Sequence, residues 1–258
     1  MLWRIDGSDV YLLGTIHFGN FDWHALPESV RHAYDRSASI VLEADTRHRP
    51  SENSLLIGSG QTLDKLVSAA VWASVSQSAA RLGLDAGRIG LFWPIITAMT
   101  LTFTEAARSG YTEAGGIDQL LRERATADGK RLEWLEALND QLGIVTGTPM
   151  LEQVSHLAYL SEQPELGVSE VRELLSAWRT GDRYRFELVL EEKRQRWPEI
   201  FKAVIEQRNI DWVPKIERLL AESSPRLVAV GSLHLVGDHG VPSLLQGRGH
   251  ILTEQAWR

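Results

Sequence analysis

The chain has 258 residues, of which 43% are hydrophobic and 24% charged, values typical of one large folded domain or of a domain with an insertion. Its formal net charge is −7 and no long run of Lys and Arg occurs, which argues against nucleic acid as a partner. Because the sequence contains no cysteine, disulfides, thiolate nucleophiles and cysteine-ligated zinc are excluded.

The start of the sequence lacks the basic segment and apolar core of a signal peptide. The longest apolar run, 91–103, is too short to span a bilayer and contains Pro94. The sequence therefore predicts a soluble chain without a membrane span. A targeting segment or anchor removed from a longer product would leave no trace, so cytoplasm and periplasm both stay open as locations.

The first fifty residues have the pattern of sheet elements around one helix. The predicted elements are a hairpin of strands 2–6 and 10–13, a helix over 27–36 and a strand over 40–42. The last strand places Glu43 and Asp45 at its carboxyl end. Because these two residues are two positions apart, they are expected to point to the same side.

Most of the following chain has helical periodicity. We predict a single domain, 1–258, in which 1–50 and 222–258 form a sheet core and about 51–221 a helical insertion. A helix over 91–108 is expected to be irregular at Pro94. A short strand is predicted at 130–134. The other predicted helices begin near 62 and cover 117–127, 138–145, 150–161, 169–180, 184–194 and 210–221.

The two ends of the chain contain a repeated motif. Residues 10–19, VYLLGTIHFG, compare with 227–237, LVAVGSLHLVG, and each continues to a proline-led helix and another strand. Two such units in one sheet would bring His17 and His234 to neighbouring strand ends. The pattern predicts an α/β (α+β) fold with a central mixed β-sheet from two pseudo-repeated strand–GxxH–helix–strand units and a large, mostly helical insertion.

The residues of the repeated turn suit a binding site. Gly14 and Gly231 allow the backbone to approach a ligand closely, and Thr15 and Ser232 are expected to donate toward bound oxygen. Neutral imidazole is the commonest metal ligand, and a nearby carboxylate completes an open three-ligand site. A lone Gly-x-x-His is a weak motif, typical of ordinary turns, and it is the repetition with the same flanks that favours a site.

Further segments occur in an order that is known from one family. They are LWRI at 2–5, YLLGTIH at 11–17, VLEAD at 41–45, GID at 116–118, Leu135-Glu136 with Gln141 shortly after, Arg208-Asn209, and VGSLHLVG at 230–237. This set closely resembles the TraB/GumN family, which includes the Tiki proteases and the pheromone-shutdown protein PrgY. The resemblance covers essentially the whole chain.

The resemblance implies a metal-dependent peptidase, as in the Tiki branch. The ligands of a divalent ion would be His17, His234 and Glu43, with Mn²⁺ or Co²⁺ favoured and Zn²⁺ also suitable. Glu43 would be the third ligand or the general base, and Asp45 is an alternative ligand. The plainer alternative for Glu43 is an ion pair with Arg208.

Other residues are expected to support the site. Arg208 suits an oxyanion or a substrate carboxylate, and an internal salt bridge to Glu43 or Glu136 is an equal alternative. Asp118 and Glu136 are expected to hold the histidine tautomers or to lie at the surface. Asn209 is predicted to cap the helix that follows it.

Three functions stay open. The leading one is a metallohydrolase acting on a peptide or protein substrate. The second is a metal-free, esterase-like hydrolase similar to the erythromycin esterases, with His17 or His234 as the general base. The third is a non-catalytic protein that sequesters a peptide signal. A homodimer is a further possibility, because the apolar helix around 91–103 offers more surface than one core is expected to cover.

Overall fold

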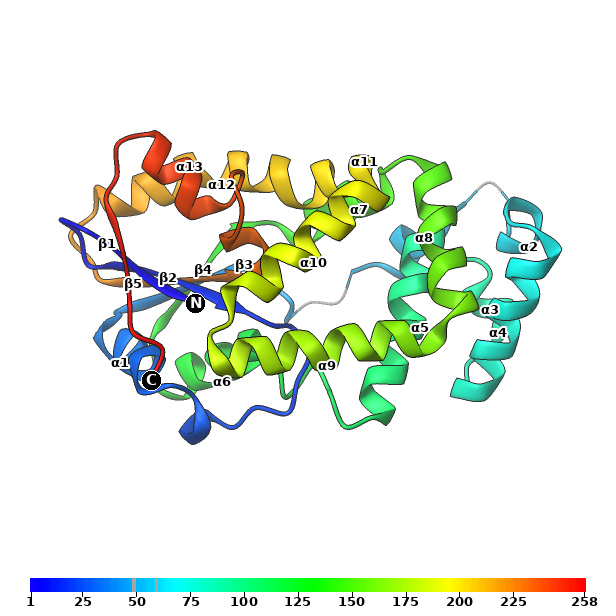
Figure 1. Cartoon of the computed structure of the whole chain (residues 1–258), viewed down its shortest axis with the longest axis horizontal. Helices are drawn as coiled ribbons and strands as arrows, with labels where there is room; N and C mark the ends of the chain where they lie inside the picture. Colours follow the sequence, from blue (N-terminus) through cyan, green and yellow to red (C-terminus); the bar gives the residue numbers. More distant parts are fainter. Residues whose placement is uncertain (48–49, 59) are drawn as a thin grey trace.

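The computed structural model describes residues 1–47, 50–58 and 60–258. The two ends of the chain form most of a six-stranded sheet, and helices form most of the remainder (Figure 1). The strands are β1 (Leu2–Ile5), β2 (Val10–Thr15), β3 (Ser39–Ala44), β4 (Arg131–Glu136), β5 (Arg226–Gly231) and β6 (Leu252–Glu254). The α-helices are α1 (Glu28–Arg36), α2 (Leu63–Leu66), α3 (Ala69–Leu82), α4 (Ala86–Ile89), α5 (Pro94–Arg108), α6 (Ile117–Ala127), α7 (Leu138–Thr146), α8 (Met150–Glu162), α9 (Pro164–Thr180), α10 (Arg183–Arg196), α11 (Pro198–Phe201), α12 (Arg208–Leu220) and α13 (Val241–Gly247). Short 3-10 turns occur at η1 (Trp23–Ala25), η2 (Glu52–Leu55) and η4 (Ser232–Leu235), and a π-helical turn occurs at η3 (Lys202–Gln207).

The sheet is mixed, in the order β4-β3-β5-β2-β1-β6. The first four strands in this order are mutually parallel, whereas β1 runs antiparallel to both of its neighbours. Strands β2 and β3 are buried along their whole length, as is usual for parallel strands covered on both faces. In Figure 1, α12 and α13 lie on one side of the sheet and α1 and α6 on the other. The predicted mixed α/β fold is confirmed.

Strand β4 lies inside the range expected to be helical insertion, yet it belongs to the sheet. It pairs with β3 in parallel, with Ala44 opposite Glu136, and α6 packs against both strands. The reason is the buried Leu135 and the partly buried Trp134, which belong to the same hydrophobic core as the other strands. As a result, Asp118 at the start of α6 and Glu136 at the end of β4 are carried to the sheet edge.

The two repeated units are alike only in their first part. Strands β2 and β5 are parallel neighbours with Thr15 opposite Gly231, so their Gly-x-x-His turns begin level with each other. The strands that follow the helices differ, because β3 pairs parallel with β5 whereas β6 pairs antiparallel with β1. Glu43 and Glu254 are therefore not equivalent, and Glu254 lies on the exposed strand β6.

The apolar helix of the insertion begins later than its sequence pattern predicts. Pro94 is the first residue of α5, where its ring fits a helix start, so the expected irregularity within the helix is absent from this described segment. The apolar side of α5 contacts α3, α8 and α9, and Leu101 belongs to a second core with Val75 and Leu157. Much of the apolar surface of α5 is therefore covered within the chain, whereas Leu91 before it is exposed. Among the described residues, no helix combines the length and apolar character needed to cross a membrane.

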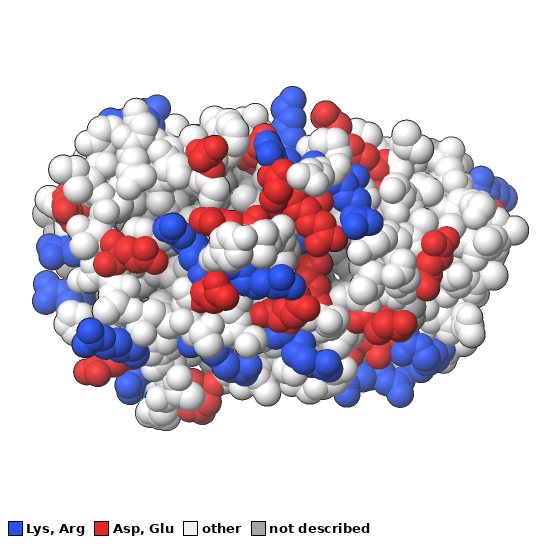
Figure 2. Space-filling view, viewed as in Figure 1, with Lys and Arg blue, Asp and Glu red and all other residues white. Residues whose placement is uncertain are grey.

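Acidic and basic side chains are interspersed on the face shown in Figure 2. Acidic side chains gather near its middle, over α9 and α10. Some of these pair with bases of the same two helices: Glu170 lies 2.7 Å from Lys193, and Glu173 contacts Arg185. This face therefore carries mixed charge rather than a continuous basic surface.

His156 on α8 is expected to make the fold sensitive to acid. Its ring packs edge-on against Trp197 at 4.5 Å, and Nδ1 is buried without a hydrogen-bond partner among the described residues. Burial lowers the pKa of His156 to about 3. Since this is below the value of about 6.5 in an unfolded chain, the unfolded state binds the additional proton and stability falls as the pH drops from about 6.5 towards 3.

We expect the free energy of unfolding to fall by up to about 1 kcal/mol per pH unit in that window because of this residue. His156→Phe keeps the ring contact with Trp197 and should remove this part of the pH dependence in urea unfolding measured at pH 7 and pH 5. His32→Phe, at an exposed position of α1, is the matched control. An unchanged pH dependence in His156→Phe would contradict the prediction.

Candidate functional site

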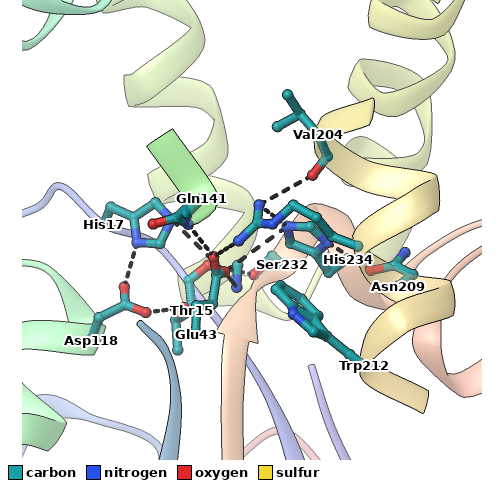
Figure 3. A network of polar contacts seen from close by, with 12 residues as sticks. Thr15, His17, Glu43, Asp118, Gln141, Val204, Asn209, Trp212, Ser232 and His234 are labelled. Carbon is teal, nitrogen blue, oxygen red and sulfur yellow. Dashed lines mark hydrogen bonds and ion pairs between the residues drawn. The ribbon is translucent and has the colours of Figure 1, made fainter. Parts of the chain in front are cut away.

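Four parallel strands end side by side at one edge of the sheet. The loop after β2 carries His17 and the turn η4 after β5 carries His234, while Glu43 is the last residue but one of β3 and Glu136 is the last residue of β4. The carboxyl ends of parallel strands are the usual location of active sites in α/β sheets. The structure thus places together residues that are far apart in the sequence (Figure 3).

Both histidines direct the same ring atom to one carboxylate oxygen. Nε2 of His17 and Nε2 of His234 each lie 4.0 Å from Oε1 of Glu43. The backbone N–H of Gly231 donates to the same oxygen at 2.7 Å. Glu43 is therefore the common centre of the two Gly-x-x-His turns.

His17 is held from behind by a carboxylate. Its Nδ1 lies 3.0 Å from Oδ2 of Asp118, whose other oxygen accepts a hydrogen bond from the Thr15 hydroxyl at 2.7 Å. The His17 side chain is 55% exposed, so its Nε2 side is accessible. The charge of Asp118 raises the pKa of His17 to about 9. Asp118 thus has the orienting role that the sequence suggested for it.

His234 has a defined tautomer. Nη1 of Arg208 lies 3.2 Å from His234 Nε2, and because a guanidinium only donates, Nε2 must be the acceptor. Nδ1 therefore carries the hydrogen and donates to Oδ1 of Asn209 at 2.7 Å. The side chain is only 4% exposed, and burial lowers the pKa of His234 to about 3. The imidazole is neutral and presents its Nε2 lone pair to the centre of the site.

Arg208 forms ion pairs with both buried glutamates of the site. Its Nη2 donates to Glu43 Oε2 at 2.5 Å and to Glu136 Oε1 at 2.7 Å, and its side chain is 4% exposed. The guanidinium lies 4.6 Å from the centre of the Trp212 ring. Both of the ion pairs considered for Arg208 from the sequence are therefore present at once.

Glu43 is ionised despite being buried. Burial alone would raise the pKa of Glu43, but the charge of Arg208, the two imidazoles and the Gly231 N–H hold it well below its usual range. The second carboxylate oxygen also accepts a hydrogen bond from Nε2 of Gln141 at 3.1 Å. The carboxylate thus has partners on both oxygens, and its position is well defined.

The hydroxyl residues of the repeated turns serve the protein rather than a ligand. Thr15 donates to Asp118, and Ser232 donates to the backbone oxygen of Thr15 at 2.9 Å. The expectation that their side chains donate toward bound oxygen is therefore wrong for this structure, because both hydroxyls already have internal acceptors. Gly14 permits the approach of the two turns, since a Cβ there would lie 2.8 Å from the Ser232 hydroxyl oxygen.

Two further predictions need correction or qualification. Asn209 does not cap a helix, because α11, η3 and α12 follow one another without a break and Asn209 lies inside this continuous helix. Its side chain instead accepts from His234 Nδ1 and donates to the backbone oxygen of His239 at 2.8 Å. Asp45 follows the end of β3, and its two oxygens accept from Arg47 at 2.8 and 2.7 Å. The structure therefore gives Glu43, rather than Asp45, the central position between the histidines.

Two residues of the site were absent from the predicted set. Gln141 comes from α7 of the insertion, and Trp212 lies four positions after Arg208 on the same helix face, with its ring 4.5 Å from the His234 ring. The Trp212 N–H also donates to Glu136 Oε2 at 3.0 Å. Helical spacing from Arg208 was the signal that identifies Trp212. Gln141 had a signal too, because it follows Leu135-Glu136 among the segments that carry the family resemblance.

The comparisons with known proteins identify the family of the chain. The chain matches the TraB/PrgY/gumN family over residues 1–254. It is 23% identical over 257 residues to the uncharacterized protein YbaP of Escherichia coli (strain K12), covering 92% of this chain and 87% of that relative. YbaP of Shigella flexneri gives the same values, 23% over 257 residues. No solved structure matches the chain. Because the family match spans both Gly-x-x-His turns and nearly the whole chain, the protein belongs to the TraB/PrgY/gumN family.

Proposed function

We propose that the protein is a metal-dependent hydrolase, specifically a metallopeptidase, in which His17, Glu43 and His234 hold a divalent cation. One observation carries the proposal. The imidazoles of the two repeated turns both direct Nε2 to the same oxygen, Oε1, of the Glu43 carboxylate, each at 4.0 Å. The peptide substrate is supported by the resemblance to the Tiki branch. His17 is 55% exposed, so a substrate in solution can reach this side of the site.

The types of ligand atom and the way they face one another suit a divalent cation. Two imidazoles with a carboxylate are common ligands of Mn²⁺, Co²⁺ and Zn²⁺. Ligands about 2.1 Å from one ion lie about 3.0–3.4 Å apart, so the separations of 4.0 Å must contract slightly. In the described part of the chain, no three or more His, Cys, Asp or Glu side chains lie close enough together to coordinate one metal ion without moving.

The formal charges around the site also favour a divalent cation. Glu43 and Glu136 contact a single guanidinium and Asp118 contacts His17, so with both imidazoles in the neutral form that binds metal these charges leave an excess of two negative charges. A cation of charge +2 balances this excess. Charge that is balanced inside the protein avoids the cost of burying an unpaired carboxylate.

In hydrolysis, a divalent cation supplies Lewis acidity and lowers the pKa of water. Glu43 would have one of two roles: its ionised Oε1, which faces both imidazoles, would either bind the cation as the third ligand or, with the imidazoles alone binding it, accept the proton of the attacking water. Asp118 and Asn209 hold the two rings with Nδ1 occupied, so that both Nε2 atoms face the reaction centre. The guanidinium of Arg208 already donates to Glu43, Glu136 and His234, so its role here is to hold these groups in place rather than to bind the substrate.

Elemental analysis tests the proposal directly. Purified protein, loaded with Mn²⁺, Co²⁺ or Zn²⁺ and dialysed, is expected to retain about one ion per chain. His17→Ala and His234→Ala should each lose it, whereas His32→Ala, at an exposed position outside the site, should not. A chelator should abolish cleavage of a mixed peptide library by the parent. Absence of retained metal in a folded parent under all three conditions would refute the metal site.

A metal-free hydrolase is the second candidate, favoured by two contacts. Arg208 already occupies the Nε2 lone pair of His234, and Asp118 orients His17 as a carboxylate orients a general base. In that mechanism the neutral form of His17 takes the proton from water, and because the pKa of His17 is raised to about 9, activity should increase as the pH rises towards 9. The discriminating result is activity that survives the chelator but is lost in His17→Ala. Peptide binding without turnover would instead support a protein that sequesters a peptide signal.

A further inference from the structure

The guanidinium of Arg208 contacts two of the three proposed metal ligands. Nη2 lies 2.5 Å from Glu43 Oε2, and Nη1 lies 3.2 Å from His234 Nε2. A neutral imidazole has one lone pair in the plane of its ring, here on Nε2. His234 therefore binds either the guanidinium or a metal ion, but not both.

We infer that Arg208 is the resident cation of this site and that a divalent ion enters by displacing its guanidinium from His234 and Glu43. The inference rests on the proposed metal site. It adds that the Arg208 guanidinium competes with the metal ion for Glu43 and His234, and that this competition sets the affinity for the metal. Both cations seek the same carboxylate and the same lone pair. Arg208 thus acts as the residue that sets how strongly divalent ions bind.

The structure provides partners that Arg208 keeps after such a displacement. Nε lies 3.1 Å and Nη2 2.7 Å from Glu136 Oε1, and the guanidinium stacks over Trp212 at 4.6 Å. Because Glu136 is anchored by the Trp212 N–H at 3.0 Å, it stays in place when Arg208 moves. The guanidinium would therefore remain paired with a carboxylate and would not be left as an isolated buried charge.

The π-helical turn before Arg208 supplies a further acceptor. In a regular α-helix the backbone oxygen of Val204 would accept from the backbone N–H of Arg208. Here that N–H bonds to Ile205, and the Val204 oxygen accepts from Nη1 of the Arg208 side chain at 3.1 Å. π-Helical turns of this kind are frequent at functional sites. The turn η3 thus gives Nη1 a partner besides His234.

Calorimetric titration with Mn²⁺ tests the competition. Arg208→Met removes the charge and frees Glu43 and His234, so it is expected to bind Mn²⁺ at least about tenfold more tightly than the parent. Arg122→Met is the matched control, because Arg122 on α6 bonds to Thr46 and Gln119 and its loss changes the net charge equally. It should alter affinity by less than about twofold.

A second variant keeps the test decisive if Arg208→Met fails to fold. Glu136→Gln retains the Arg208–Glu43 pair but removes the carboxylate that holds the displaced guanidinium, so Mn²⁺ should bind several times more weakly. Unchanged or weaker binding in Arg208→Met, or unchanged binding in Glu136→Gln, would overturn this inference while leaving the proposed metal site intact wherever the parent binds Mn²⁺. Absence of Mn²⁺ binding in the parent and in all folded variants would overturn both.

Discussion

Glu43→Ala is expected to lower the free energy of unfolding by about 3–5 kcal/mol. The carboxylate is 6% exposed and Arg208 is 4% exposed, so removal of Glu43 leaves a guanidinium buried with Glu136 as its remaining carboxylate. The Gly231 N–H and the Gln141 amide lose their acceptor in the same step. An unpaired buried group costs more than the intact ion pair contributes, which is why the loss is large.

Urea unfolding at neutral pH measures this loss. Glu43→Gln is the informative partner, because its amide oxygen still accepts from Gly231 and it should lose less stability than Glu43→Ala. Glu217→Ala is the matched control on the surface: Glu217 pairs with Arg248 at 2.7 Å, but both side chains are partly open to solvent. Equal unfolding midpoints for Glu43→Ala and Glu217→Ala would show that the central ion pair contributes little.

His17→Ala and His234→Ala are expected to reduce kcat/KM by about a thousandfold or more on any peptide that the parent cleaves. Their effects on stability should differ, because the two imidazoles have different surroundings. His234 is 4% exposed, bonds to Asn209 at 2.7 Å and packs on Trp212, so its loss should cost about 2–3 kcal/mol. His17 is 55% exposed, and its loss should leave the melting temperature nearly unchanged.

Parallel kinetics and thermal unfolding of the two variants provide the measurement. Equal loss of activity with unequal loss of stability would place both histidines in one reaction centre. His32→Ala again serves as the exposed control and should retain both properties. Full activity in either site variant would contradict a shared role for the two Gly-x-x-His turns.

Local sequence patterns were sufficient for much of the sheet core. The apolar runs before Gly14 and Gly231 predicted strands, and the repetition predicted that His17 and His234 would lie at neighbouring strand ends, as they do in β2 and β5. Proline and glycine marked several helix boundaries well, as at α6. These features are accessible because they depend on hydrophobic periodicity and on backbone preferences over a few neighbouring residues.

The environment of each site residue was decided by contacts between distant segments. Asn209 has a sequence context that is typical of a helix cap, yet the continuous helix from α11 to α12 turns it towards His234. Thr15 and Ser232 look like ligand donors until packing gives them Asp118 and a backbone oxygen as acceptors. A residue type and its neighbours cannot specify which partner a side chain will find.

The sequence by itself therefore determined the class of fold, the two histidine turns and the glutamate that lies between them. Tertiary structure alone decided that β4 joins the sheet, that Gln141 reaches Glu43 from the insertion, and that Arg208 lies between Glu43 and His234. The physical reason is range: strand and turn preferences act over a few residues, whereas Arg208 and Glu43 are 165 positions apart and meet only once the sheet and α12 have packed.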